Sequence, residues 1–172
     1  ATLVFRSRRG GQFGVVLKKL TTGAESVLTR TLADHFPAVS RDGSKVAYSY
    51  RENGRMPIFV VAAGGGPPER VCDDCGQVET WSPGGDQILY VAAGDPSGVG
   101  VVTVGASPNH GWLKNTAYGI YNPRLSPDGR LVYAIDDAGL MVALDSASGA
   151  RAWEAADTMG QASPTIGPDG TI

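Results

Sequence analysis

Two cysteines three positions apart, Cys72 and Cys75, carry the most reactive side chains of this chain. Their C-x-x-C spacing is typical of redox pairs and of half zinc sites. A zinc site needs two further ligands, and the only histidines, His35 and His110, lie far away in the sequence, where we expect a loop and a turn, respectively. A thioredoxin-like role requires a βαβ setting, which the sequence does not show. We therefore expect tolerated thiols or a local disulfide at the edge of a structural unit.

Other groups that could do chemistry are sparse. Adjacent carboxylates occur at Asp73-Asp74 and at Asp136-Asp137, where they could bind calcium or cap turns, and no calcium-loop pattern supports the first reading. The glycine-rich run 64–68 lacks the Gly-Lys-Ser/Thr ending of a phosphate loop. No G-x-S-x-G motif is present. The sequence therefore predicts no catalytic residues, no metal site and no cofactor.

The composition excludes several classes of partner. The net charge is −2, which provides no positive field for nucleic acid or for an anionic membrane surface. No run of apolar residues is long enough for a transmembrane helix, so we expect no membrane insertion. The first residues also lack the pattern of a signal peptide. With 24 glycines and 11 prolines in 172 residues, we expect many short elements joined by turns.

An internal repeat is the strongest signal in the chain. Each copy ends in a Ser-x-Asp-Gly or related turn, and the copies span residues 36–43, 79–85, 123–129 and 164–170. Their last glycines are 42, 44 and 41 residues apart. Because Asp and Gly favour tight turns and apolar stretches flank them, each of the first three copies predicts a hairpin. Tyrosines in the second strands, at positions 48, 50, 90 and 133, are expected in the core.

This period predicts an all-β protein, a β-propeller of about four four-stranded blades. We expect a single domain, 1–172, with repeat units at about 1–35, 36–77, 78–120 and 121–160. Residues 161–172 are expected to close the ring by adding a strand to the first blade, since closure removes exposed sheet edges. The alternatives are half of an eight-bladed dimeric ring and a piece of a longer array.

The repeated turn, with Ser126-Pro-Asp-Gly129 as its clearest copy, closely resembles the TolB-type, WD-like propeller repeat of bacterial proteins. The resemblance covers about residues 1–139, with departures at 40–43 and 82–85. It implies a non-catalytic module that binds protein partners, and it favours the bacterial periplasm or cell envelope. Fold alone does not assign a function.

The last unit carries a different pattern. It is similar to the tryptophan-docking motif of quinoprotein (PQQ-like) propeller repeats, through Ala143, Asp145, Ser148, Gly149 and Trp153. The resemblance implies that these residues lock adjacent blades together. Ser148 stands where that family usually has Thr, and a single copy does not imply the quinone.

Propellers bind through one end of the ring, so we predict a binding face from the loops expected at one end. Arginine and tyrosine are favoured at binding hot spots. The candidates are Arg8, Arg9, His35, Arg51, Arg55, Glu79, Tyr121, Asn122, Asp136 and Gln161. We expect a binding or scaffolding module whose partner is another protein or a second copy of the chain. The alternative is a propeller enzyme, a hydrolase, lyase or quinoprotein-like protein, with a metal or cofactor in the central channel.

Overall fold

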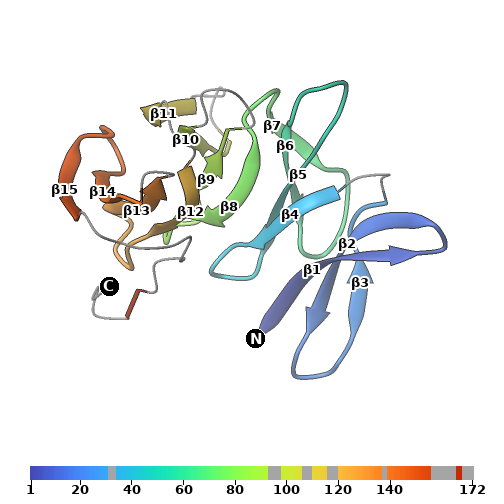
Figure 1. Ribbon diagram of the computed structural model, residues 1–172. Coiled ribbons are helices and arrows are strands. Elements are labelled where there is room, and N and C mark those ends of the chain that lie inside the picture. The colour runs from blue at the N-terminus through green and yellow to red at the C-terminus, as the bar shows by residue number, and fades with distance from the viewer. Residues whose placement is uncertain are drawn as a thin grey trace.

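The chain folds as a curved array of antiparallel sheets, with β1–β3 at one end and β12–β15 at the other (Figure 1). Every helix or strand in the described residues is a β-strand, which confirms the all-β prediction. The computed structural model describes residues 1–30, 34–92, 98–105, 110–115, 120–136, 139–155 and 166–167.

Each sheet contains strands that follow one another in sequence, so that neighbouring strands are joined as hairpins. The first sheet consists of β1 (Thr2–Arg9), β2 (Gln12–Lys19) and β3 (Glu25–Val27). The second consists of β4 (Asp34–Val39), β5 (Lys45–Tyr50), β6 (Ile58–Ala62) and β7 (Glu69–Cys72). The third consists of β8 (Gln77–Trp81), β9 (Gln87–Val91), β10 (Gly98–Thr103) and β11 (His110–Asn115). The fourth consists of β12 (Ile120–Leu125), β13 (Leu131–Asp136), β14 (Met141–Asp145) and β15 (Arg151–Ala155).

The repeated Ser-x-Asp-Gly segments form the turns that join the first two strands of a blade. In the second sheet, Ser40 Oγ donates to Asp42 Oδ1 at 2.6 Å, and the Lys45 amide donates to Ser40 Oγ at 3.0 Å. The same pattern holds Ser126 and Asp128 in the fourth sheet. The predicted hairpins are therefore confirmed, and the serine and aspartate hold the turn because each satisfies the other.

The third sheet keeps this turn although its sequence departs from the pattern. Gly84 occupies the position that aspartate has in the other copies, and Asp86 stands two residues later. Ser82 Oγ donates to Asp86 Oδ1 at 2.9 Å and accepts from the Gln87 amide at 3.0 Å. A shifted carboxylate thus reproduces the same network.

Three apolar clusters lie between consecutive sheets. The first joins β2 to β5 and β6, the second joins β5, β6 and β7 to β8, β9 and β10, and the third joins β9 and β10 to β13 and β14. Strands such as β6 and β10 are buried on both faces because each blade packs between two others. Trp81, at 5% exposure, also donates its indole N–H to the Ala38 carbonyl in the preceding blade, at 3.0 Å.

Tyr90 shows why a glycine stands in the middle of a strand. Gly100 lies opposite Tyr90, and a Cβ at Gly100 would come within 2.3 Å of the tyrosine Cζ. The ring therefore packs flat over β10, where burial raises the pKa of Tyr90 to about 12. Tyr48 and Tyr133 are buried as predicted, and Tyr50 is half-buried.

The two histidines and the predicted closing strand differ from the other sequence-based expectations. His35 and His110 were expected in loops, but both lie within strands, where His35 pairs with Ser49 and His110 with Val102. The strands extend further than the turn residues suggested because pairing continues to the ends of their partners. Among described residues the first sheet has three strands, and the closing segment 161–172 lies outside the described residues except for 166 and 167, which are in no strand.

Candidate functional site

The two ends of the blades differ in the connections that they hold, and we call them the turn end and the crossover end. The turn end holds the repeated turns at 40–43, 82–85 and 126–129. The crossover end is opposite, and it holds the β1–β2 hairpin, the β5–β6 hairpin at 51–57 and the connection from β7 to β8. The predicted binding residues that the structure describes lie at or toward the crossover end.

The first strands of three blades, β4, β8 and β12, share a backbone irregularity. Each has a register shift against its neighbour, between His35 and Ala38 in β4 and at the equivalent positions of β8 and β12. Phe36 and Asn122 have positive φ angles of 52° and 46°, and each precedes a proline. Such backbone costs about 1–3 kcal/mol per residue and gathers at functional sites. These irregularities mark β4, β8 and β12, which we call the inner strands, as a candidate site.

Glu79 lies at this level of β8 and pairs with Arg124 of β12. The Arg124 Nη1 and Glu79 Oε2 atoms are 3.4 Å apart, and Gln77 Nε2 donates to Glu79 Oε1 at 2.8 Å. The Glu79 side chain is only 10% exposed, whereas that of Arg124 is 40% exposed. Burial raises the pKa of Glu79 even though the nearby Arg124 guanidinium acts in the opposite direction. A carboxylate that is desolvated on the inner wall is typical of a functional position.

Two open cavities adjoin this pair, and Thr80 and Arg124 line both of them. The first, of about 300 Å³, is lined by Phe36, Pro37, Gln77, Val78, Glu79, Thr80 and Arg124. The second, of about 330 Å³, extends to the turn end past Arg41, Trp81 and the turn residues Ser82 and Ser126. Phe36 is 44% exposed, which is high for a phenylalanine. The inner strands therefore present an aromatic ring and a charged pair to open space.

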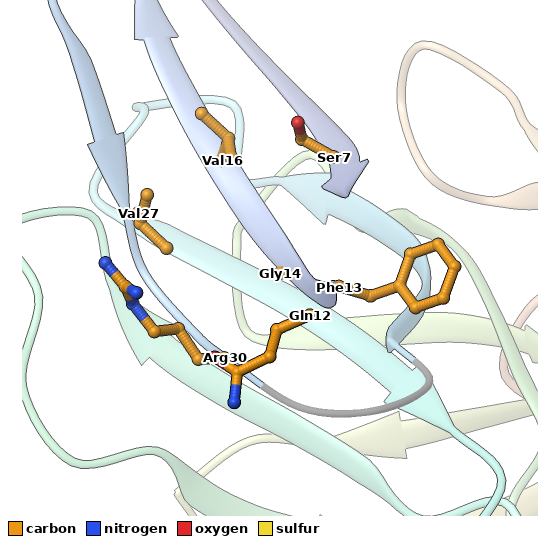
Figure 2. Close-up of a pocket in the computed structure, with 7 residues that line it drawn as sticks. All are labelled: Ser7, Gln12, Phe13, Gly14, Val16, Val27 and Arg30. Carbon is orange, nitrogen blue, oxygen red and sulfur yellow. The ribbon is translucent and has the colours of Figure 1, made fainter. Parts of the chain in front are cut away.

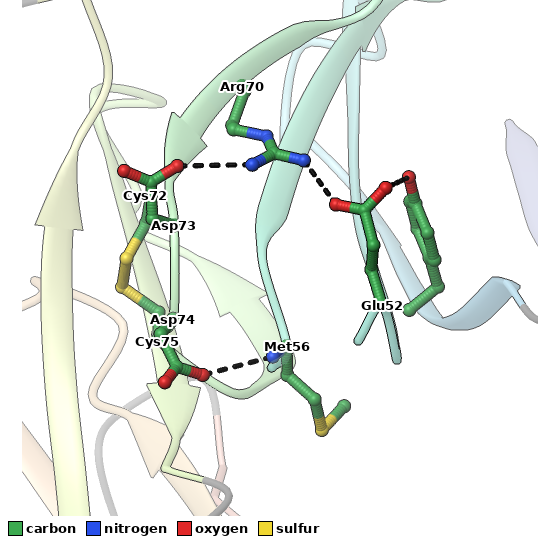
Figure 3. Close-up of polar contacts among 8 residues, drawn as sticks. Glu52, Met56, Arg70, Cys72, Asp73, Asp74 and Cys75 are labelled. Atoms are coloured by element: carbon green, nitrogen blue, oxygen red, sulfur yellow. Dashed lines mark hydrogen bonds and ion pairs between the residues drawn. A yellow bond between two sulfur atoms is a disulfide. The ribbon is translucent and has the colours of Figure 1, made fainter. Parts of the chain in front are cut away.

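A chain of polar contacts holds the crossover end of the second blade (Figure 3). Arg70 pairs with Glu52 in the β5–β6 hairpin and with Asp73, at 3.2 Å for the latter. Asp74 Oδ1 accepts from the Met56 amide at 3.0 Å. These contacts hold the 51–57 hairpin against the connection that leads to β8. Asp73 and Asp74, which the sequence suggested as turn caps, both take part in them.

Cys72 and Cys75 form a disulfide within this connection, with both residues buried. This confirms the local disulfide among the two alternatives that the spacing left open. The bond joins the end of β7 to the segment before β8, beside the contacts of Asp73 and Asp74 (Figure 3).

Three predicted arginines are exposed at the crossover end. Arg51 and Arg55 lie in the β5–β6 hairpin, where Glu52 and Arg55 form an isolated bridge. Arg8 lies at the end of β1, with its guanidinium carbon 5.4 Å from the centre of the Phe13 ring. The structure thus brings Glu79 close to the strand that carries Asn122, while these arginines lie on the hairpins farther out.

The remaining predicted face residues are described less completely. Arg9, His35, Tyr121 and Asp136 have backbones in β1, β4, β12 and β13, and their side chains fall outside the described part of the structure. Gln161 lies outside the described residues altogether.

The residues that resemble the docking motif form the β14–β15 connection of the last blade. Asp145 Oδ1 accepts from the Ser148 hydroxyl at 2.6 Å and from its amide at 2.8 Å, and these bonds lower the pKa of Asp145. Gly149 has a φ of 71°. Ala143 lies opposite Trp153, whose ring centre is 6.0 Å from that of Tyr133 in the same blade. Trp153 remains 37% exposed.

Sequence reasoning missed Arg124, Gln77 and Phe36. The repeat register contained a usable signal, because Phe36, Val78 and Asn122 occupy equivalent positions before the Ser of each turn. Among the described residues, no group of three or more histidine, cysteine, aspartate or glutamate side chains is placed to hold a metal ion. The same part of the chain has no helix long and apolar enough to cross a membrane.

The sheets and their inner strands define a β-propeller, and the described residues form part of its ring. It matches the β-propeller domain of Swd1 from Myceliophteria thermophila with a TM-score of 0.70 and 12% identity, over 97% of this chain and 58% of that one. It matches TolB from Acinetobacter baumannii with a TM-score of 0.77 and 18% identity, over 98% of this chain and 44% of that one. The fold is therefore that of a TolB-like propeller.

At the level of sequence, the Tol-Pal system protein TolB of Methylobacillus flagellatus is 33% identical over 78 residues. That match covers 44% of this chain and 18% of the relative. No family model matches the chain. The chain thus spans less than half of the Acinetobacter structure and under a fifth of the sequence relative.

Proposed function

We propose that the chain is a non-catalytic protein-binding module that acts in the bacterial periplasm or cell envelope. The observation that carries the proposal is the Glu79–Arg124 pair, which joins two inner strands beside an open cavity with an exposed Phe36. Holding a carboxylate in a desolvated position costs stability, and binding proteins accept such a cost where a partner benefits. The relative's name places TolB in the Tol-Pal system, so we propose Pal as the partner.

The proposed contact surface is the crossover end together with the mouth of the inner cavity. Arg51 and Arg55 supply exposed guanidinium groups on a hairpin that Arg70 and Asp74 hold in place. Because the backbone of this hairpin is already held in place, little backbone freedom is lost on binding, which favours affinity. Tyr121 and Asn122 lie in the inner strand β12 and complete the proposed surface.

Titration calorimetry with purified Pal of Methylobacillus flagellatus tests this proposal, with TolB of that organism as the positive control. We expect the chain to bind Pal and the variant R51A/R55A/Y121A to lose at least about tenfold in affinity. The matched control K45A/R130A removes two exposed charges at the turn end and should bind as the original chain does. A triple variant with unchanged affinity overturns the surface, and a folded chain that does not bind Pal overturns the partner.

We also propose that the residues from Ala143 to Trp153 form a quinoprotein-type repeat whose tryptophan docks against a neighbouring blade. Trp153 is 37% exposed, so part of its side chain is available to a neighbouring blade, while its contact with Tyr133 in the same blade orients the ring. The motif concerns assembly of the propeller and assigns no cofactor.

A further inference from the structure

Charge is distributed very unevenly along the chain. Residues 1–30 contain six arginines and lysines against one acidic residue, Glu25, which gives a formal charge of +5. Since the whole chain carries −2, the remaining residues carry −7. The single acid is also occupied, because Glu25 pairs with Lys18 at 3.1 Å. The first blade is therefore a basic unit in an acidic protein.

Two of these arginines, Arg6 and Arg8, stack on Phe13 at the β1–β2 hairpin, whereas Arg30 points away from the Phe13 ring (Figure 2). Arg8 lies directly opposite Phe13 in the strand register, and the guanidinium carbons of Arg6 and Arg8 lie 4.7 and 5.4 Å from the centre of its ring. Arg30 lines a small cavity together with Phe13. Stacking on an aromatic ring holds a guanidinium in place while its N–H groups stay available to an anion. Within the described part of the chain, Arg8 and Arg30 form no ion pair.

The cavity beside this hairpin, of about 30 Å³, adds an apolar component. Figure 2 shows Val16 and Val27 on one side of it, with the Arg30 and Gln12 side chains near its rim. Val27 is 39% exposed, and Arg30 is exposed as well. Arg30 borders this hollow, whereas Arg6 and Arg8 flank Ser7 in β1 and project from the opposite face of the sheet. The hairpin end therefore carries guanidinium groups on both faces and an apolar hollow on one of them, which suits an extended segment that wraps around the hairpin end and alternates apolar and acidic side chains.

The same charges favour a short acidic protein segment over a nucleic acid. Screening limits exposed charges to a range of about 8 Å at physiological salt, so a short ligand meets mainly the basic blade. A nucleic acid carries a phosphate charge about every 1.7 Å of duplex and extends across the acidic blades, where it is repelled.

We propose that the hairpin end of the first blade binds an acidic, extended segment of a partner protein. Carboxylates of the segment pair with Arg8 and Arg30, and a small apolar side chain contacts Val27. This inference rests on the proposed function, since it specifies the chemistry of the partner at the crossover end of the first blade. It assigns a binding role to Phe13 and Arg30, which the predicted face did not include.

Fluorescence anisotropy tests the proposal with a short labelled peptide of alternating glutamate and valine. We expect the original chain to bind it at low salt and to release it as salt is raised. The variant R8E/R30E should weaken binding by about a hundredfold, because two contacts become repulsive. The matched variant K45E/R130E has the same net charge and carries its changes at the turn end, so it should lose much less affinity. Circular dichroism confirms that both variants are folded.

The apolar component has its own test. Val27→Ser should weaken binding of the glutamate–valine peptide by severalfold and leave binding of a glutamate–serine peptide unchanged, since only the first peptide uses the apolar contact. An equal loss for both peptides contradicts the assignment of the cavity.

The remaining outcomes separate this inference from the proposed function. Equal loss in R8E/R30E and K45E/R130E overturns the inference, because net charge alone then explains binding. Tighter binding of a single-stranded oligonucleotide assigns the patch to nucleic acid instead, and light scattering that detects association at low salt assigns it to a second copy. If R8E/R30E no longer binds the peptide but still binds Pal, the inference about the basic hairpin end is supported, and this surface binds a partner other than Pal. If it keeps the peptide while R51A/R55A/Y121A loses Pal, the proposed function stands and this inference falls.

Discussion

The carboxylates at the two ends of the blades behave in opposite ways. At the turn end, hydrogen bonds from neighbouring serines lower the pKa of Asp42, Asp128 and Asp145. On the inner wall toward the crossover end, burial raises the pKa of Glu79. The first group favours the charged form that the native turns need, so these residues stabilise the fold. Burial disfavours the charged form of Glu79, so this carboxylate does not stabilise the fold in the way that the turn carboxylates do.

Removal of residues 161–172 should have the largest effect on the stability of the protein. The segment contains Pro168-Asp-Gly170, the fourth copy of the turn sequence, and we propose that it closes the ring on the first blade. Its loss should expose the edge of β1 and cause unfolding or oligomerisation. Light scattering and thermal unfolding of the shortened chain provide the measurement.

The outcome also bears on assembly. A shortened chain that stays monomeric and melts unchanged contradicts ring closure by this segment. For the complete chain, a mass of about 17.9 kDa supports a monomer, whereas twice that mass supports two half-rings in one eight-bladed propeller.

Gly76→Ala should have the next largest effect, because it affects the support of the crossover end. Gly76 has a φ of 137°, and a Cβ there would lie 2.0 Å from the Val91 carbonyl oxygen. We expect the free energy of unfolding to fall by about 3 kcal/mol, measured by urea denaturation.

Gly66→Ala is the matched control for this change. Gly66 also has a positive φ, of 123°, but a Cβ there meets no atom within 4 Å. It should cost about 1 kcal/mol, from backbone strain alone. Equal losses in the two variants would show that the close approach to Val91 is unimportant.

The contribution of the turn end to stability should depend on pH in the acid range. Hydrogen bonds from Ser40 and Ser44 lower the pKa of Asp42 from 3.8 to about 2. The stability that this carboxylate provides is present above the ordinary pKa and is lost as the pH falls toward about 2. Asp42→Asn should therefore reduce the drop in melting temperature across this window. Parallel curves for the two proteins would contradict the assignment.

Glu79→Gln should have the smallest effect on stability, and of the opposite sign. Because the pKa of Glu79 is raised, its burial favours the protonated form, and that contribution is lost as the pH rises through the raised pKa. The neutral glutamine should leave the melting temperature at neutral pH unchanged or slightly raised, with the difference vanishing in acid. Pal binding should fall in the same variant. A large loss of stability at neutral pH would show that the pair with Arg124 is structural.

Much of the fold followed from local sequence. The serine, aspartate and glycine of each turn make contacts within a few residues, so their pattern alone predicted the hairpins and the blade period. The displaced Asp86 was the exception, since its role depends on where its carboxylate reaches. Strand ends were less predictable, as His35 and His110 show, because pairing with a neighbour decides them.

The repeat, the all-β class and the concentration of positive charge in the first 30 residues all follow from the amino-acid sequence alone. The bond between Cys72 and Cys75 is visible only in the three-dimensional structure, because the spacing allows both the bonded and the free state. The same is true of the contact between Glu79 and Arg124, which lie 45 residues apart on different blades. Such a contact, and the desolvation that raises the pKa of Glu79, depend on how blades pack against one another. Local sequence patterns do not specify this packing, which is why the site could be identified only in the folded structure.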